Sequence, residues 1–156
     1  MNAIQMLKQD HEKVRKLFRE YADSDHRSRE KRDAAQQALM ELEIHSKLEE
    51  EIFYPAVRQT GDELRESVEE GYAEHREVDR LVEELKAMDP STGQFGERFQ
   101  ALIGAVEHHV AEEVGEMLPK AEGRLGGEAD RLGQEMTRRR EALMRELMPS
   151  TERSRM

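Results

Sequence analysis

The chain has 156 residues, a formal net charge of −10 at pH 7 and no cysteine. The length fits one domain, or one domain with an appendage, and the lack of cysteine excludes disulfides, thiolate metal sites and cysteine nucleophiles. The negative charge argues against nucleic acid and anionic membranes as partners. Because the chain has no long apolar run and its first residues do not follow a signal-peptide pattern, we expect a cytoplasmic protein.

Apolar residues recur at helical spacing along four segments, and turn or cap residues separate each segment from the next. The expected helices cover residues 2–22, 29–58, 62–88 and 94–120. Short connections between long helices favour antiparallel neighbours. The sequence therefore predicts an all-α fold, with an up-down-up-down antiparallel four-helix bundle over residues 1–121.

An additional C-terminal helix is predicted after a glycine-containing break. Ala129, Leu132 and Met136 begin its apolar stripe, which ends near Pro149. Residues 122–156 would then form this helix and a frayed tail. Two interpretations remain open: the helix is a lid on the bundle, or it is a surface for a homodimer or another partner.

The chain contains an internal repeat with a period of 64 residues. The segments "HSKLEEEIFYP" (45–55) and "HVAEEVGEMLP" (109–119) share a His, a Glu four residues later and a Pro ten residues later. The segments "DHEKVRKLF" (10–18) and "EHREVDRLV" (74–82) share an acidic residue followed by His. The same offset in both comparisons indicates two copies of one helix pair, each with a lone His and then His-x-x-x-Glu.

Four histidines are expected at one height of the bundle, because each turn lies midway in sequence between successive histidines. Each lies on an apolar stripe and should point inward, with a Glu one helical turn further on in two cases. Such groups are costly in an apolar core unless they are satisfied. Two metal ions would satisfy all six at once. The predicted ligands are His11, His45, Glu49, His75, His109 and Glu113.

Nitrogen and oxygen ligands without sulfur suit iron, manganese or zinc. We expect the first two histidines to hold one ion, the last two to hold the other, and the two glutamates to bridge them. A hydrogen-bonded core residue is the alternative interpretation for any single buried histidine.

The pattern His … His-x-x-x-Glu … His … His-x-x-x-Glu, with the "EEIFYP" segment, resembles the hemerythrin-like proteins, specifically the bacterial hemerythrin HHE cation-binding domain, over residues 1–120. The resemblance implies a left-twisted four-helix bundle that holds a non-haem di-iron centre. In it, two iron ions are bridged by carboxylates and by an oxo or hydroxo group. Carried over by position, the iron ligands are the same six residues.

The chain departs from the oxygen-carrying hemerythrins, which have five histidines and a His-x-x-x-His pair in the third helix. Here Gly71 and Asp79 lie four residues before and after His75, and the fourth helix carries Glu113 in place of an Asp five residues after its His. With one imidazole missing, we expect the two iron sites to be more alike and more open. This disfavours reversible oxygen carriage and favours an enzyme or a sensor.

Three functions follow as hypotheses. The first is a di-iron protein that reacts with hydrogen peroxide or O₂, in catalase-like peroxide decomposition, with the di-iron centre itself as the reactive group. The second is a module that binds or senses O₂ or nitric oxide, or handles iron, without turnover; the fifth helix would be its output surface. The third is a structural or zinc-bound bundle without a redox role.

Other polar residues near the ligands are secondary candidates. Tyr54 and Tyr72 are weak candidates to approach an iron or to donate a hydrogen bond to bound peroxide. Asp10 and Glu74 could accept hydrogen bonds from ligand histidines, although surface positions are the simpler interpretation. His108 lies about 100° around the helix from its neighbour His109 and should face outward.

Overall fold

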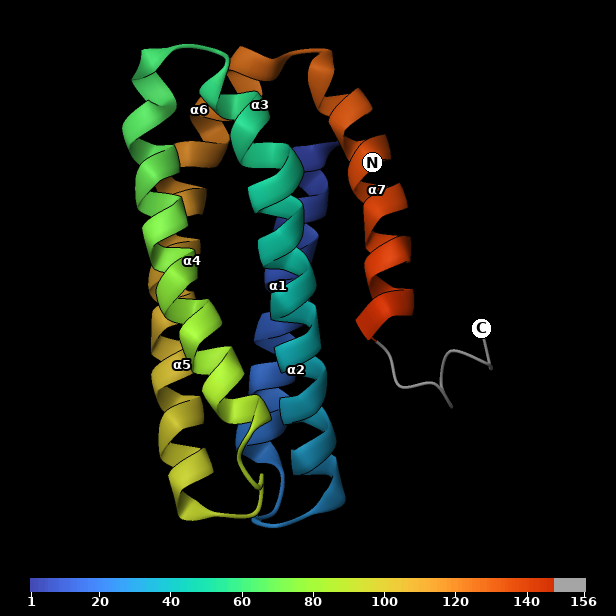
Figure 1. The fold of residues 1–156 in the computed structure, drawn as a ribbon, viewed down its shortest axis with the longest axis vertical. Helices are drawn as coiled ribbons and strands as arrows, with labels where there is room; N and C mark the ends of the chain where they lie inside the picture. Colours follow the sequence, from blue (N-terminus) through green and yellow to red (C-terminus); the bar gives the residue numbers. More distant parts are fainter. Residues whose placement is uncertain (148–156) are drawn as a thin grey trace.

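The computed structural model describes residues 1–147, which form an antiparallel bundle of four helical rods with a fifth helix along one side (Figure 1). This confirms the predicted all-α fold with an extra helix. The four rods are α1 (Ala3–Asp23); α2 (Arg29–Leu48), η1 (Glu49–Phe53) and α3 (Tyr54–Arg58); η2 (Asp62–Leu64) and α4 (Arg65–Lys86); and α5 (Gly93–Glu112), η3 (Glu113–Met117) and α6 (Leu118–Leu125). The fifth helix is α7 (Glu128–Leu147).

Side-chain caps begin three of the rods. Asn2 accepts from the Gln5 backbone N–H while the Gln5 side chain accepts from the Asn2 N–H, which satisfies two amides that lack helical partners. The hydroxyls of Ser28 and Thr92 accept from backbone amides three residues on and play the same role for α2 and α5. These caps fix the ends of the rods, and thereby the height of each histidine.

Two π-helical segments interrupt the second and fourth rods at equivalent places. Tyr54 N–H donates to the Glu49 carbonyl, and Leu118 N–H donates to the Glu113 carbonyl, each five residues back. A proline follows directly in both rods, at positions 55 and 119. Proline inside an α-helix loses a hydrogen bond and clashes with the carbonyl four residues earlier, and the wider turn accommodates it.

α7 lies beside α1 and α2 and runs along the outside of the bundle (Figure 1). Ala129, Leu132, Met136 and Leu143 are buried against it, so the structure supports the interpretation of this helix as a lid. The expected division at residue 121 stays a prediction, and it falls inside α6. That helix continues to Leu125 and ends where Gly126 takes a positive φ of 53°. The expected end of the fifth helix at Pro149, and the tail, lie outside the described residues.

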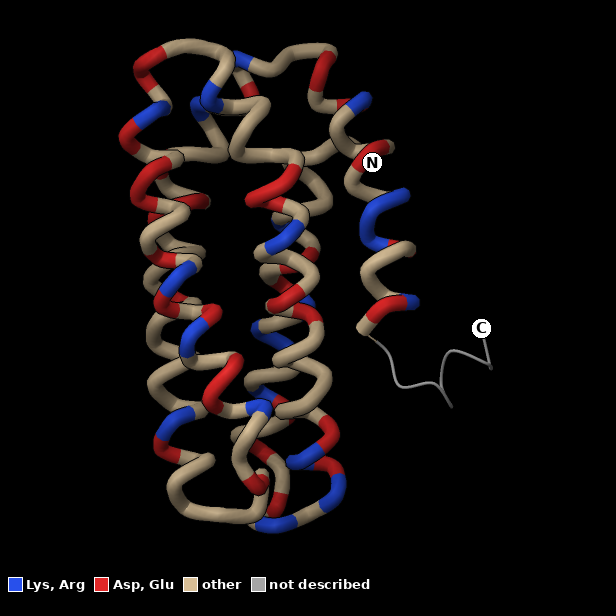
Figure 2. Tube along the Cα trace, in the orientation of Figure 1, with Lys and Arg blue, Asp and Glu red and all other residues tan. Residues whose placement is uncertain are grey.

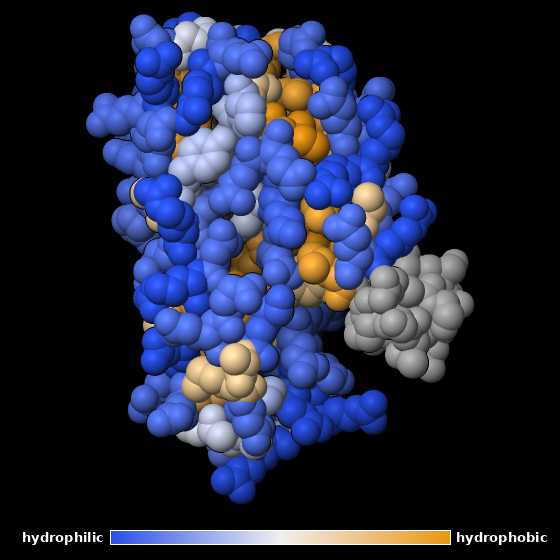
Figure 3. Space-filling view, viewed as in Figure 1, coloured by the Kyte–Doolittle hydropathy of each residue, from blue (hydrophilic) through white to orange (hydrophobic). Residues whose placement is uncertain are grey.

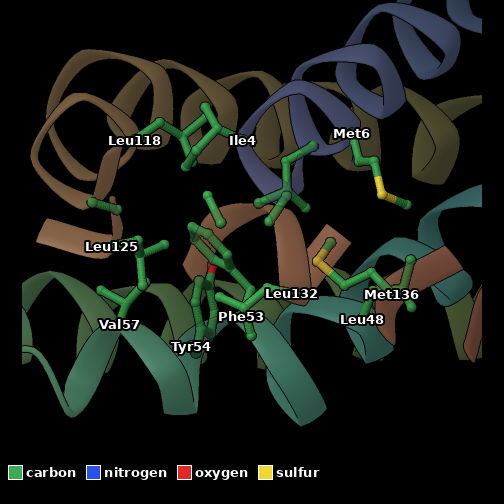
Figure 4. Close-up of a cluster of buried hydrophobic side chains, with 14 of the residues drawn as sticks. Ile4, Met6, Leu48, Phe53, Tyr54, Val57, Leu118, Leu125, Leu132 and Met136 are labelled. Atoms are coloured by element: carbon green, nitrogen blue, oxygen red, sulfur yellow. The ribbon is translucent and has the colours of Figure 1, made fainter. Parts of the chain in front are cut away.

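Two apolar clusters fill the bundle on either side of a polar layer. The cluster at the end near the chain's N-terminus includes Phe53, Leu118 and Met136 (Figure 4). The other packs Phe18 and Phe99 edge to face, with centroids 5.7 Å apart. The four predicted histidines lie between these clusters, in the middle of the core.

Charged residues of both signs cover the outside of the rods, including α7 (Figure 2). Figure 3 shows that hydrophilic side chains dominate the face in view, with hydrophobic atoms visible in narrow strips between them. In the part of the chain that the structure describes, no helix is both long and apolar enough to cross a membrane.

Candidate metal centre

The six predicted ligands converge in one buried layer. Each has 6% or less of its surface exposed. The imidazoles form two pairs: the ring centroids of His11 and His45 are 5.0 Å apart, and those of His75 and His109 are 4.7 Å apart. The four histidines therefore lie at one height of the bundle, as expected.

Each glutamate side chain lies between the two histidine pairs. Glu49 Oε1 lies 3.0 Å from His45 Nε2 and 2.9 Å from His75 Nε2. Glu113 Oε2 lies 2.7 Å from His109 Nε2, and its Oε1 lies 3.5 Å from His11 Nε2. Each carboxylate can thus reach a ligand set on either side, as a bridging carboxylate must.

The donor atoms fit a pair of metal ions better than a set of hydrogen bonds. Six buried atoms of the predicted ligands find no hydrogen-bond partner among the described residues: His11 Nδ1 and Nε2, His45 Nε2, His75 Nδ1, Glu49 Oε2 and Glu113 Oε1. Ligand atoms within 4.8 Å of one another form two groups that share Glu113, one with His11 and His45 and one with Glu49, His75 and His109. Unsatisfied atoms of this kind are costly in a core, and metal coordination would satisfy them.

Protons balance the charge of the layer in the metal-free chain. Burial works against a charged His45, but Glu49 and Asp10 outweigh it and raise the pKa of His45 to about 10. Burial likewise opposes charge on His109, where Glu113, Glu49 and Glu74 raise the pKa to about 12. Metal ions prefer neutral imidazole, so they would bind by displacing these protons.

Two ligand histidines are held from behind by carboxylates. His45 Nδ1 lies 3.0 Å from Asp10 Oδ2, and His109 Nδ1 lies 2.7 Å from Glu74 Oε1. Because a carboxylate only accepts, each Nδ1 carries the proton and each Nε2 is directed toward the layer. The simpler expectation of surface positions is wrong for Asp10, which is buried, and Glu74 is half-buried.

Tyr54 lies inside the layer, closer to the ligands than its place at the end of the second helix suggested. Its hydroxyl donates to Glu113 Oε2 at 3.0 Å and lies 3.3 Å from His75 Nε2. Gly71 makes room for the ring, since a Cβ there would lie 2.7 Å from the Tyr54 oxygen. The phenol therefore occupies the space beside Gly71, the position four residues before His75.

A helical wheel misplaces Tyr54 because of the π-helix. In an α-helix, the residue five after Glu49 lies about 140° away from it. The hydrogen bond from Tyr54 N–H to the Glu49 carbonyl widens the turn and brings the two side chains to the same side. The proline at position 55 was the signal in the sequence that could have revealed this shift.

The other secondary candidates lie outside the layer. The Tyr72 hydroxyl donates to the Glu50 carbonyl at 3.3 Å, and its ring packs edge-on against Tyr54. The expectation that Tyr72 approaches the ligands is therefore not met, although it supports Tyr54 from outside. His108 is exposed, as expected, and lies 3.3 Å from Glu74 and 3.2 Å from Glu112.

A small cavity adjoins the four histidines on the side of the second apolar cluster. Its volume is about 20 Å³, and its apolar wall includes Val14, Leu42, Val78 and Val106. A space of this size holds about one water molecule. It leaves room for a small molecule next to the imidazoles, but not for a large substrate.

Comparison with known proteins identifies the class. The family model "Hemerythrin HHE cation binding domain" matches residues 2–121. The chain therefore belongs to this family. A solved structure titled as a hemerythrin HHE cation-binding domain-containing protein, the Rv2633c homolog from Mycobacterium kansasii, superimposes with a TM-score of 0.77 at 27% sequence identity. The match covers 92% of this chain and 87% of that one.

Two relatives are similar to this chain over most of its length. The uncharacterized protein Rv2633c of Mycobacterium tuberculosis (strain ATCC 25618 / H37Rv) is 29% identical over 120 residues, which cover 76% of this chain and 71% of that protein. A DNA nickase of Nostoc sp. (strain PCC 7120 / SAG 25.82 / UTEX 2576) is 34% identical over 113 residues, 72% of this chain. The matched residues span only 31% of the nickase.

Proposed function

We propose that this protein holds two iron ions in the His/Glu layer and uses them to decompose hydrogen peroxide or to react with O₂. The observation that carries the proposal is the convergence of four imidazoles and two carboxylates, with unpaired buried atoms on each carboxylate. When bound, two iron ions supply the change of oxidation state that the side chains lack. Disproportionation of two peroxides gives two waters and one O₂.

The surroundings of the layer fit a small oxidant. The adjoining cavity admits about one water-sized molecule. Tyr54 offers a proton donor beside the ligands, because burial first, and then the nearby Glu49 and Glu113, raise the pKa of its phenol and keep it protonated. A protonated phenol can hydrogen-bond to a small molecule that enters the layer.

The test is anaerobic loading with Fe(II), removal of excess metal, and addition of hydrogen peroxide with an oxygen electrode as readout. Wild type should evolve O₂, and Glu113→Gln should not, because it removes a shared carboxylate ligand. Glu112→Gln is the matched control, since Glu112 is adjacent in sequence, has 43% of its side chain exposed and lies 3.2 Å from the surface residue His108. Absence of O₂ from iron-loaded wild type would overturn the catalytic proposal.

A second candidate is a module that binds or senses O₂ or nitric oxide without turnover. It is favoured by one contact: Arg140 of α7 pairs with Asp10, which holds His45. A sensor needs such a link to an output surface. Iron-loaded protein that changes its spectrum with O₂ or nitric oxide but evolves no O₂ from peroxide would favour this candidate.

A further inference from the structure

Arg140 connects α7 to the ligand layer. Its Nη2 donates to Asp10 Oδ1 and Oδ2, both at 2.6 Å. Asp10 Oδ2 also accepts from His45 Nδ1 at 3.0 Å. The fifth helix is therefore two polar contacts away from a predicted metal ligand, although it lies 130 residues from Asp10 in the sequence.

The geometry gives Arg140 a role that packing alone does not require. Asp10 and His45 are buried, so neither can exchange its partner for bulk water. Arg140 engages both oxygens of Asp10, which restricts rotation of the carboxylate and keeps Oδ2 aimed at the imidazole. A fixed acceptor on Nδ1 orients the ring and makes Nε2 a better ligand. Nε2 then remains directed at Glu49 and the layer.

The other half of the bundle has no such contact. Glu74 holds His109 in the same way, but its side chain is 20% exposed and its second oxygen pairs with the surface residue His108. Within residues 1–147, no lysine or arginine forms an ion pair with Glu74. The arginine contact thus distinguishes one side of the centre from the other.

We propose that Arg140 is a positioning residue of the metal centre, which couples docking of α7 to metal binding on the side of His11 and His45. The inference rests on the metal centre of the proposed function, but not on its reaction with peroxide. Coupling between two equilibria is reciprocal. A docked α7 therefore strengthens metal binding, and bound metal holds α7 more firmly.

Arg139 provides a matched control on the same helix. Its Nε donates to Glu51 Oε1 at 3.0 Å, so it also ties α7 to the bundle through an ion pair. Among the described residues, Glu51 forms no ion pair or hydrogen bond with any of the six predicted ligands. If Arg140 served only to dock α7, Arg139→Gln and Arg140→Gln would have equal effects on the metal centre.

The experiment uses Zn²⁺, which is diamagnetic and binds without redox chemistry. Affinity is measured by competition with a chromophoric chelator for wild type, Arg140→Gln, Arg140→Lys and Arg139→Gln. We expect Arg140→Gln to weaken zinc binding by about 10-fold, the lower end of the range for residues that support a ligand. Arg140→Lys should recover part of the loss, and Arg139→Gln should match wild type.

Two structural readouts accompany the affinity. In zinc-loaded protein, the His45 Nδ1 proton should exchange faster in Arg140→Gln, while the His109 Nδ1 proton is unchanged. Zinc should slow amide exchange along α7 in wild type but not in Asp10→Asn. Two results would overturn the inference: equal zinc affinities for Arg139→Gln and Arg140→Gln, or amide exchange along α7 of the wild type that is the same with and without zinc. A wild type that evolves no O₂ from peroxide, yet shows this coupling, would overturn the catalytic proposal alone.

Discussion

The two halves of the bundle carry the same ligands in different surroundings. In the first half, α1 and α2 supply His11 and His45, η1 supplies Glu49, and Arg140 of α7 pairs with the carboxylate behind His45. In the second half, α4 and α5 supply the matching histidines, and Glu74 remains near the surface. The repeat determines which atoms face the buried layer, whereas α7 gives the carboxylate on one side an arginine partner.

A second difference separates the halves at the π-helices. Tyr54 in the first copy corresponds to Leu118 in the second, 64 residues later, and Gly71 corresponds to Leu7. The phenol therefore enters the layer from one side, where a glycine leaves space for it. On the opposite side, Leu118 and Leu7 belong to the apolar cluster. A duplicated scaffold thus becomes asymmetric through two substitutions in matching positions.

Removing a shared carboxylate should have the largest effect. Glu113→Gln or Glu49→Gln should lower metal affinity in both halves by more than about 100-fold, because ligands matter more than the residues that support them. His11→Ala should affect only the ion on its own side. Metal content after dialysis, determined for each variant, checks this. Retention of both ions by Glu113→Gln would show that this carboxylate is not shared.

Neutralising the carboxylates behind the histidines should lower the free energy of unfolding by different amounts in the two halves. Asp10→Asn leaves Arg140 without its buried partner, and we expect a loss of about 2–3 kcal/mol in the free energy of unfolding, below the range for fully buried pairs. Glu74→Gln should cost less, about 1–2 kcal/mol, because Glu74 is partly exposed and an amide oxygen can still accept from His109 Nδ1–H. Denaturant unfolding of the metal-free proteins measures both values. Equal losses would contradict the asymmetry.

Filling the space beside Tyr54 should destabilise the protein. In Gly71→Ala, the new Cβ would meet the phenol oxygen at 2.7 Å and Cζ at 2.8 Å, so the ring must move. We expect a cost of about 1–3 kcal/mol. Gly104→Ala is the control, because nothing lies within 4 Å of a Cβ there, and helix propensity should make it neutral or stabilising by up to about 1 kcal/mol.

Metal removal should reverse the pH dependence of stability. In the metal-free chain, the pKa of His45 is raised from 6.5 to about 10, so the stability from its charged ring is full below pH 6.5 and is lost as pH rises toward 10. In the metal-loaded chain, the imidazoles must be neutral, so stability should fall as pH is lowered. Thermal unfolding with and without a chelator across this range tests the sign. The same slope in both states would contradict metal binding by these histidines.

The ligand layer could be predicted because the repeat and the apolar stripes carry it. Each copy of the repeat contains a lone His and then His-x-x-x-Glu, and the two copies lie 64 residues apart. This pattern locates the layer without any knowledge of packing. The position of Tyr54 could not be predicted from a helical wheel, because the wheel assumes 3.6 residues per turn and the π-helix before Tyr54 has a wider turn. The contact of Asp10 with Arg140 depends on how α7 docks, across 130 residues, and local pattern carries no signal for that.

The most direct test of this account is the number of metal ions that the intact chain binds. Protein reconstituted anaerobically with Fe(II) and freed of excess metal should contain two irons per chain, one for each of the two ligand groups that share Glu113. A chain that takes up no iron, or one iron that survives loss of either histidine pair, would contradict the account of a centre built from two matched halves.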